Sequence, residues 1–246
     1  MGYLYLLAQT ADAGISFGPK EIWDSMTWIS KLVALILILM SIWSVYVTIE
    51  RLLVFRKAKQ QSLQFAKQVT QYLAQDRLSD AIEASRKYKH SHLARVTRAG
   101  LIEMQLVESK STGLSSADMV EAARRAVERE TLIAYSDFKK GTGSLATIAT
   151  TAPFIGLLGT VIGIIAAFAG MAAAGSGGIA TVSAGISEAL VATALGLMVA
   201  IPAAWMFNYF TNILERFQVE MSNSSSELLD YFIKKHGGSH AIGVRQ

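Results

Sequence analysis

The sequence predicts an all-helical integral membrane protein with three transmembrane helices, and three observations support this class. Hydrophobic residues make up 52% of the chain and charged residues only 17%. The mean hydropathy is +0.35, whereas a soluble domain carries about 25% charged residues. Two long stretches are almost free of charge, and no proline occurs between Pro19 and Pro153. Long helices, some of them embedded in lipid, satisfy all three observations.

The first predicted transmembrane helix covers residues 31–50. Eighteen uncharged, mostly apolar residues run from Leu32 to Ile49, close to the roughly twenty that cross the hydrocarbon core of a bilayer. A signal peptide is the alternative, but the stretch begins some thirty residues into the chain and no small-residue cleavage site follows it. We therefore expect it to be retained, with residues 1–30 forming a periplasmic segment.

Residues 51–140 are predicted to form a cytoplasmic helical region, into which long helices continue from the spans. Apolar residues recur at helical spacing in "SLQFAKQVTQYLAQ" and "RLSDAIEASRKYK". Ser115 and Asp118 have the spacing of a capping box at the start of a further helix. Glu121 and Arg125, four residues apart in that helix, favour a solvated face.

The second apolar region is about twice as long as one span requires. The glycine-rich stretch "AAAGSGGIAT" interrupts it, which predicts transmembrane helices over 141–172 and 181–210 joined by a periplasmic loop, 173–180. Pro153 and Pro202 are predicted to bend these two helices. Residues 211–246 would form a cytoplasmic C-terminal helix and tail.

The orientation follows from the distribution of charge. Residues 50–140 hold seventeen Lys and Arg against eleven Asp and Glu. Since cytoplasmic segments carry the excess of Lys and Arg, this region should lie inside the cell. The N-terminus is then outside and the C-terminus inside.

Glu188 is the candidate functional residue. It is the only Asp, Glu, Lys, Arg or His between Gly141 and Leu214. A carboxylate within the bilayer costs about 2.5–3.5 kcal/mol on insertion scales, and such groups face a bundle interior or a cavity. A proton path is one interpretation, and a structural carboxyl group bonded to a neighbouring helix is the other.

Other residues of these two spans could line a polar path or allow close packing. Thr160 and Thr193 would form a polar lining if both faced the inside of a closed bundle, although a threonine in a membrane helix more often bonds its own i−4 carbonyl. Close packing is predicted at the small residues, and because one three-span chain has little interior of its own, we expect a homo-oligomer. These packing positions are Gly156, Gly159, Gly163 and Gly196.

Several classes of function lack sequence support. The chain has no cysteine, which excludes a disulfide framework, a thiolate nucleophile and a cysteine metal site. The four histidines lie in polar stretches. His90-Ser91-His92 could bind a metal loosely, but a solvated loop is the favoured interpretation. No catalytic triad, phosphate loop, HExxH motif or nucleic-acid module appears. We expect no enzymatic activity, no metal, no cofactor and no nucleic-acid partner.

Two stretches resemble the signature spans of the ExbB/TolQ/MotA proton-channel family. They are "GSLATIATTAPFIGLLGTVIGIIAAF" (143–168) and "GISEALVATALGLMVAIPAAWMFN" (185–208). One early span, a large cytoplasmic segment and two late spans resemble the ExbB/TolQ branch, since MotA-type stators have four spans. The chain departs from the family pattern at Ile162, where Trp is common, and at Ala184, where Pro is common.

The resemblance implies a homopentamer in the bacterial inner membrane whose second and third spans line a pore. It places Glu188, Thr160 and Thr193 at the polar pore positions of the family. The implied partner is an ExbD/TolR-like protein, whose single span carries an aspartate inside the pore, and a TonB/TolA-like protein is a further candidate partner. The chain would convert the proton motive force into mechanical work for outer-membrane transport or envelope processes. The alternatives are a stator-like subunit of a gliding machinery, a structural scaffold and a proton-coupled transporter.

Overall fold

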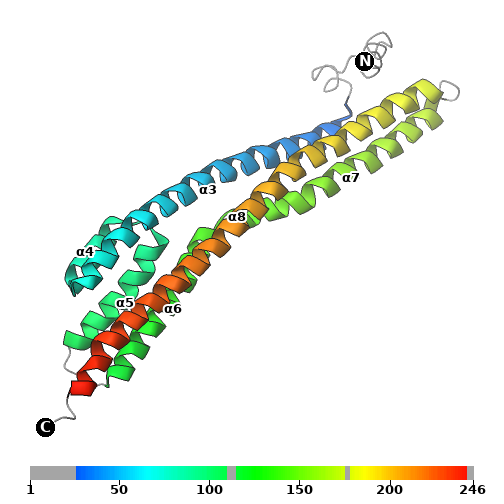
Figure 1. Ribbon diagram of the computed structural model, residues 1–246. Coiled ribbons are helices and arrows are strands. Elements are labelled where there is room, and N and C mark those ends of the chain that lie inside the picture. The colour runs from blue at the N-terminus through cyan, green and yellow to red at the C-terminus, as the bar shows by residue number, and fades with distance from the viewer. Residues whose placement is uncertain (1–25, 110–114, 175–177, 243–246) are drawn as a thin grey trace, which may run out of the picture. The chain divides into compact units, whose positions relative to one another are not determined.

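The computed structural model describes residues 26–109, 115–174 and 178–242, and the regular elements in these ranges are all α-helices (Figure 1). A long first helix is followed by three shorter helices and then by two more long helices. In chain order they are α3 (Trp28–Ala74), α4 (Leu78–Lys87), α5 (His92–Ser109), α6 (Ser116–Lys139), α7 (Thr142–Ala174) and α8 (Gly178–Ile242). The prediction of an all-helical protein is confirmed.

Three of the described helices are long and apolar enough to cross a membrane, namely α3, α7 and α8. This agrees with the number of spans predicted. Helices that continue beyond the spans were also predicted, and two of the three do so: α3 begins at Trp28 and continues to Ala74, and α8 continues past residue 210 to Ile242. No glycine or proline occurs from Ala203 to Lys235, so nothing in that stretch interrupts helical hydrogen bonding.

The connection between α7 and α8 is shorter than the predicted loop, 173–180. Helix α7 extends to Ala174 and α8 begins at Gly178; residues 175–177 of the predicted loop lie outside the described residues. Alanine has the highest helix propensity of the amino acids. The three alanines from Ala172 to Ala174 therefore explain why α7 continues into the predicted loop. Pro153 and Pro202 both lie inside their helices and end neither.

The chain divides into two compact units, and α3 and α8 each contribute residues to both. Unit 1 comprises Met1–Tyr46 and Ser144–Met206, and unit 2 comprises Val47–Gly143 and Phe207–Gln246. The core of unit 1 is built from small and aliphatic side chains of three helices. These buried residues are Val33 and Leu37 of α3, Ile148 and Ala152 of α7, and Ala192, Ala200 and Ala203 of α8.

The core of unit 2 is larger and contains more bulky side chains. Phe65, Leu101, Met104, Met221 and Phe232 are all fully buried in it. Ser115 and Asp118 form the predicted capping box at the start of α6: each side chain accepts the backbone N–H of the other residue. The predicted pair Glu121–Arg125 is present at 3.7 Å.

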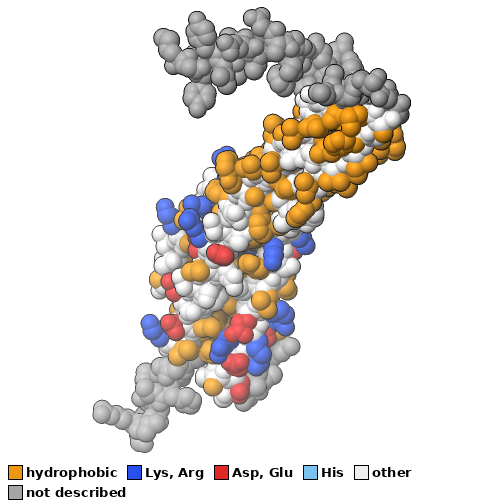
Figure 2. All heavy atoms as spheres, turned by 90° about the vertical axis from the view of Figure 1, so that its right-hand side faces the viewer, with side chains coloured by type: hydrophobic (Ala, Val, Ile, Leu, Met, Phe, Trp, Pro, Cys, Tyr) orange, Lys and Arg blue, Asp and Glu red, His pale blue; other side chains and the backbone are white. Residues whose placement is uncertain are grey.

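The surfaces of the two units differ in composition. In Figure 2, hydrophobic side chains cover most of the visible surface of unit 1, while Lys, Arg, Asp and Glu are scattered over unit 2. Large apolar side chains that are more than half exposed include Leu39, Ile42 and Trp43 of α3, Phe154 and Ile165 of α7, and Leu190, Met198 and Trp205 of α8. Since the chain has three helices able to span a membrane, this apolar surface is suited to contact with lipid or with other transmembrane helices.

Candidate functional site

Glu188 lies on α8 in unit 1 and is half-buried. Its Oε1 atom accepts the backbone N–H of Thr27 at 2.7 Å. The same oxygen accepts the Thr27 hydroxyl at 3.2 Å. The isolated carboxyl group is therefore bound to a neighbouring segment of the same chain.

Thr27 immediately precedes the first residue of α3, Trp28. Its hydroxyl oxygen accepts the backbone N–H of Ser30 at 3.3 Å and lies 3.0 Å from the Ser30 hydroxyl, which is the geometry of a helix N-cap. The first N–H groups of a helix have no intrahelical partner and carry a partial positive charge. A carboxylate is well placed at such an end, so Glu188 is linked to the beginning of α3 by complementary charge as well as by two hydrogen bonds.

Thr160 of α7 and Thr193 of α8 are brought together. Their hydroxyl oxygens lie 3.4 Å apart, and the Thr193 hydroxyl donates to the carbonyl oxygen of Gly156 on α7 at 3.1 Å. Thr160 is buried and donates to the carbonyl of Leu157 in its own helix at 2.6 Å. The two threonines thus form a polar contact between α7 and α8, and Thr193 does not use a carbonyl of its own helix.

The four predicted packing glycines explain why Thr193 can reach the backbone of α7. A Cβ atom added at Gly196 would lie 2.7 Å from the carbonyl oxygen of Ala152 and 3.1 Å from the Cα of Gly156. Added at Gly159 or Gly163, it would lie 2.9 Å from the Cβ of Ala192 or Ala189 respectively. These contacts join α7 to α8 within one chain, so the glycines by themselves do not indicate oligomerisation.

Two threonines near the start of α7 bond carbonyl groups of their own helix, as threonine in a membrane helix commonly does. Thr150 donates to the carbonyl of Ala146 at 3.0 Å, and Thr151 donates to that of Thr147 at 2.7 Å. Both hydroxyls are satisfied within their own helix. They provide no separate polar site.

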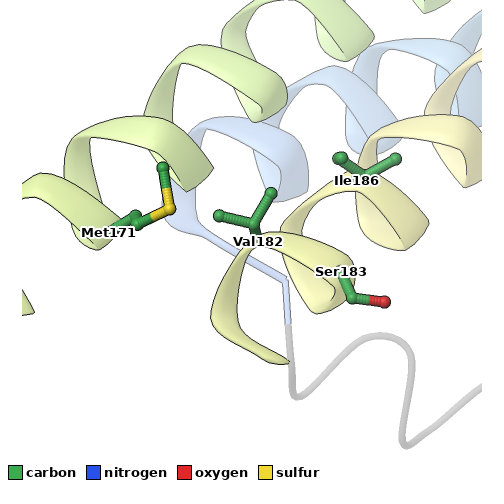
Figure 3. Close-up of a pocket in the computed structure, with 4 residues that line it drawn as sticks. All are labelled: Met171, Val182, Ser183 and Ile186. Atoms are coloured by element: carbon green, nitrogen blue, oxygen red, sulfur yellow. The ribbon is translucent and has the colours of Figure 1, made fainter. Parts of the chain in front are cut away.

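A shallow pocket lies where the end of α7 faces the beginning of α8 (Figure 3). Met171 of α7 and Val182, Ser183 and Ile186 of α8 line it. The walls are mostly apolar, and Ser183 supplies the polar side chain among them. No titratable residue is among these four, so the pocket offers no chemistry of its own beside Glu188.

The prediction for His92 was wrong. It was expected in a solvated loop, but it is the first residue of α5 and its side chain is fully buried. Its Nε2 atom lies 2.7 Å from Oε2 of Glu220, and its Nδ1 atom lies 3.0 Å from the Ser62 hydroxyl. Neither partner is near His92 in the sequence, so no local pattern could have predicted this burial.

Two further polar clusters link helices of unit 2. Arg95 of α5 binds Glu130 and Asp137 of α6, at 2.9 Å and 3.0 Å. Hydrogen bonds from Lys140 and Arg95 lower the pKa of Asp137. In the second cluster, Asp76 accepts the hydroxyl of Tyr231 at 2.6 Å and pairs with Lys235 at 2.7 Å. Within the described residues no group of three or more His, Cys, Asp or Glu side chains could hold a metal ion.

Comparison with known proteins identifies the family. The family model of the MotA/TolQ/ExbB proton channel family matches residues 88–223, more than half of the chain. A biopolymer transport protein ExbB of Pseudomonas putida is 37% identical over 108 residues, which are 43% of this chain and 33% of the relative. The protein of the same name from Xanthomonas campestris pv. campestris (strain B100) is 32% identical over 153 residues, or 62% of this chain and 55% of the relative.

A third relative, the ExbB protein of Neisseria gonorrhoeae, is 42% identical over 72 residues, which are 29% of this chain and 33% of the relative. The matches to these three relatives span from 33% to 55% of their lengths. The three long apolar helices and the family match together define a multi-pass membrane protein. The chain belongs to the MotA/TolQ/ExbB proton channel family.

Proposed function

We propose that this chain is the channel-forming subunit of an ExbB/TolQ-like motor, which uses the proton motive force to do mechanical work on a partner complex. The observation that carries the proposal is the isolation of Glu188, the only Asp, Glu, Lys, Arg or His between Gly141 and Leu214. Glu188 belongs to a helix long and apolar enough to span a membrane. The segment matched by the proton-channel family includes Glu188, Thr160 and Thr193.

In this proposal the three residues contribute different chemistry. Glu188 binds and releases the transported proton, since the carboxyl groups of Asp and Glu act as proton relays in pumps and transporters. Thr160 and Thr193, whose hydroxyls meet at the contact of α7 and α8, provide donors and acceptors that water in a pore can use. Pro153 and Pro202 bend the two helices that carry them.

The proposal includes an assembly and an orientation. The chain forms a homopentamer in the bacterial inner membrane, with its N-terminus outside and residues 51–140 and 211–246 in the cytoplasm. A single-span ExbD/TolR-like protein with an intramembrane aspartate occupies the central pore, and a TonB/TolA-like protein transmits the work. The relatives named biopolymer transport protein ExbB support a transport process over gliding as the one that is energised.

A structural role for Glu188 is the second candidate, and the bonds to Thr27 favour it specifically. With one carboxylate oxygen accepting both donors of Thr27, Glu188 would simply fasten α8 to the beginning of α3. This role requires a hydrogen-bond acceptor, whereas a proton path requires a group that gains and loses a proton. The two roles therefore respond differently to replacement by glutamine.

The deciding experiment compares Glu188→Gln with Glu188→Ala in the full chain expressed with its single-span partner. The amide oxygen of glutamine still accepts from Thr27 but the side chain cannot carry a proton. A proton path predicts that both variants lose proton-motive-force-dependent transport completely, while Glu188→Gln still assembles with the partner. Transport in cells and complex assembly in detergent are measured on the same preparations.

Thr27→Val is the matched control for the structural role. It removes the hydroxyl donor at 3.2 Å and leaves the backbone N–H donor. If Glu188 only fastens the helices, Thr27→Val and Glu188→Ala weaken assembly and transport together, and Glu188→Gln remains active. A fully active Glu188→Gln protein would show that the proton-path assignment is wrong.

A further inference from the structure

A buried histidine joins three helices of unit 2. His92 of α5 is 0% exposed. Its two ring nitrogens bond Glu220 of α8, at 2.7 Å, and Ser62 of α3, at 3.0 Å. One face of the ring stacks on Phe217 of α8, with centroids 4.0 Å apart and an interplanar angle of 19°. The ring of Phe138 of α6 is nearly perpendicular to the His92 ring, with centroids 6.2 Å apart and an interplanar angle of 86°.

When the imidazole is neutral, both ring nitrogens of His92 and the hydroxyls of Ser62 and Ser91 have hydrogen-bond partners. Nε2–H donates to the Glu220 carboxylate, and Nδ1 accepts the Ser62 hydroxyl. The Ser62 oxygen lies 2.8 Å from that of Ser91 and can accept its hydroxyl, while the Ser91 oxygen accepts the backbone N–H of Ala94 at 3.0 Å. In this chain of bonds the Ser91 hydroxyl therefore donates to Ser62, the Ser62 hydroxyl donates to His92, and the ring N–H donates to Glu220.

Protonation of His92 would disrupt this order. Both ring nitrogens are donors in the imidazolium, so Ser62 could no longer donate to Nδ1. Its hydroxyl would lose this acceptor, and if it turned toward Ser91 the Ser91 hydroxyl would lose its acceptor instead. A buried donor without a partner is destabilising, so the added proton weakens the cluster on the side of α3.

A nucleophilic role for the same three residues is excluded by burial. Ser, His and Glu in hydrogen-bonding sequence are the components of a catalytic triad. Ser62 is only 3% exposed and His92 is fully buried, so no substrate could reach the serine oxygen. The cluster is accessible to solvent through Glu220, whose side chain is 47% exposed.

The charged residues named beside His92 are Glu220 of α8 and Arg95 of its own helix. Glu220 is the charged group that contacts the ring, and it shares an open groove on α8 with Glu215 and Arg216. Arg95, on the same helix as His92, pairs with two carboxylates of α6, Glu130 and Asp137. The group that α3 presents to the ring is the uncharged Ser62.

We propose that Ser62, His92 and Glu220 form a proton-binding site that ties α5 to α3 while His92 is neutral and releases this tie when His92 is protonated. The ligand is a proton delivered from bulk water through the half-exposed Glu220. The site is separate from Glu188, on a different stretch of α8, and it does not depend on the proposed function. It would make the packing of unit 2 sensitive to the pH around this unit.

The direction of the pH effect follows from the environment of the ring. Burial lowers the pKa of His92, and the hydrogen bond and charge of Glu220 oppose this only in part. The folded unit therefore binds the proton more weakly than the unfolded chain, whose histidine pKa is about 6.5. The stabilisation by neutral His92 is fully present above that value and is lost as the pH falls below it toward the lower pKa of the folded state.

The experiment measures the distance between α3 and α5 in the full chain by electron paramagnetic resonance. Because the chain has no cysteine, Gln64→Cys and Ile102→Cys place two spin labels at exposed positions on the two helices. We expect one narrow distance distribution at about pH 7.5 and a broader one at about pH 5, on either side of the ordinary histidine pKa. The change should reverse when the pH is raised again.

Three variants separate this site from general acid sensitivity. His92→Gln keeps a donor and an acceptor but does not titrate, so its distribution should not change with pH. His90→Gln removes an exposed histidine two residues away and should respond as the wild type does. Glu220→Gln removes the charge that favours the imidazolium, so the broadening should begin at a lower pH. The proposal is overturned if the wild-type distribution does not change over this range, or if His92→Gln responds as the wild type does.

Discussion

Units 1 and 2 are both helical, but they achieve tight packing by different means. In unit 1 glycine and alanine bring backbones into contact: a Cβ at Gly156 would lie 2.8 Å from the carbonyl oxygen of Ala192. In unit 2 bulky side chains such as Phe65 and Phe232 fill the interior, and ion pairs and the His92 cluster join the helices. The glycine of unit 2 that is most closely surrounded, Gly100, faces the side chains of Leu228 and Val127.

This difference is the one expected between helices that pack in lipid and helices that pack in water. Between helices in lipid there is no hydrophobic driving force, and close contact between backbones supplies van der Waals attraction. In water the burial of apolar side chains supplies the free energy of association, and charged groups stay hydrated at the surface. The three helices able to span a membrane place their apolar windows in unit 1, which is consistent with its glycine-based packing.

The largest effect is expected at Gly156. In Gly156→Ala the new Cβ would lie 2.8 Å from the Ala192 carbonyl oxygen and 3.1 Å from the Cα of Thr193. Backbone atoms of a packed helix cannot move away independently, so we expect a loss of about 2–3 kcal/mol of stability. Thermal unfolding in detergent, followed by circular dichroism, measures it.

Two other glycines test whether the type of neighbour decides the cost. Gly100→Ala meets side-chain atoms of Leu228 and Val127 at 2.7 Å, which can change rotamer, so its cost should be smaller. Gly143→Ala meets nothing within 4 Å and should be neutral or stabilising by up to about 1 kcal/mol through helix propensity. Equal losses for Gly156→Ala and Gly100→Ala would contradict the distinction between the units.

An intermediate effect is expected from the Arg95 cluster of unit 2. Arg95→Ala leaves Glu130 and Asp137 without their shared partner and should cost about 1–2 kcal/mol, because both pairs are partly buried and hydrogen-bonded. Unfolding of the variant and the wild type is compared at low and high salt. The difference between them should shrink as salt is added.

Asp137 adds a dependence on pH to the same cluster. Its pKa is lowered by Lys140 and Arg95, so the stabilisation is present above the unfolded value of about 3.9 and is lost as the pH falls through the folded value. We expect wild type to lose stability below about pH 4 and Asp137→Asn to lose less over the same range. If the asparagine variant loses as much, another carboxyl group is responsible.

The smallest effect is expected for Arg124 on the exposed face of α6. It lies 2.9 Å from Glu128 and 3.9 Å from Glu121, but all three side chains are more than half exposed. Solvent-exposed helix pairs contribute about 0.3–0.5 kcal/mol, so Arg124→Ala should barely change the unfolding midpoint. A loss as large as that of Arg95→Ala would mean that burial does not distinguish the two clusters.

The sequence by itself determined the fold class, the three long apolar helices, the capping box of α6 and the isolation of Glu188. These features depend on composition, on local spacing and on the absence of charge over many residues, and each can be read along one segment. It also determined which glycines could pack closely, because four-residue spacing places them on one face of a helix. It left the exact ends of the helices open, because no glycine or proline between Ala203 and Lys235 ends α8 there.

Only the tertiary structure decided which groups these residues meet. Glu188 bonds Thr27, 161 positions away in the sequence, and Thr193 donates to the carbonyl of Gly156, 37 positions away. His92 looked solvated because its sequence neighbours are polar, yet its partners Ser62 and Glu220 come from two other helices. A polar side chain can be buried where distant segments supply its hydrogen bonds, and helical periodicity specifies the face of a residue but not the segment that covers it.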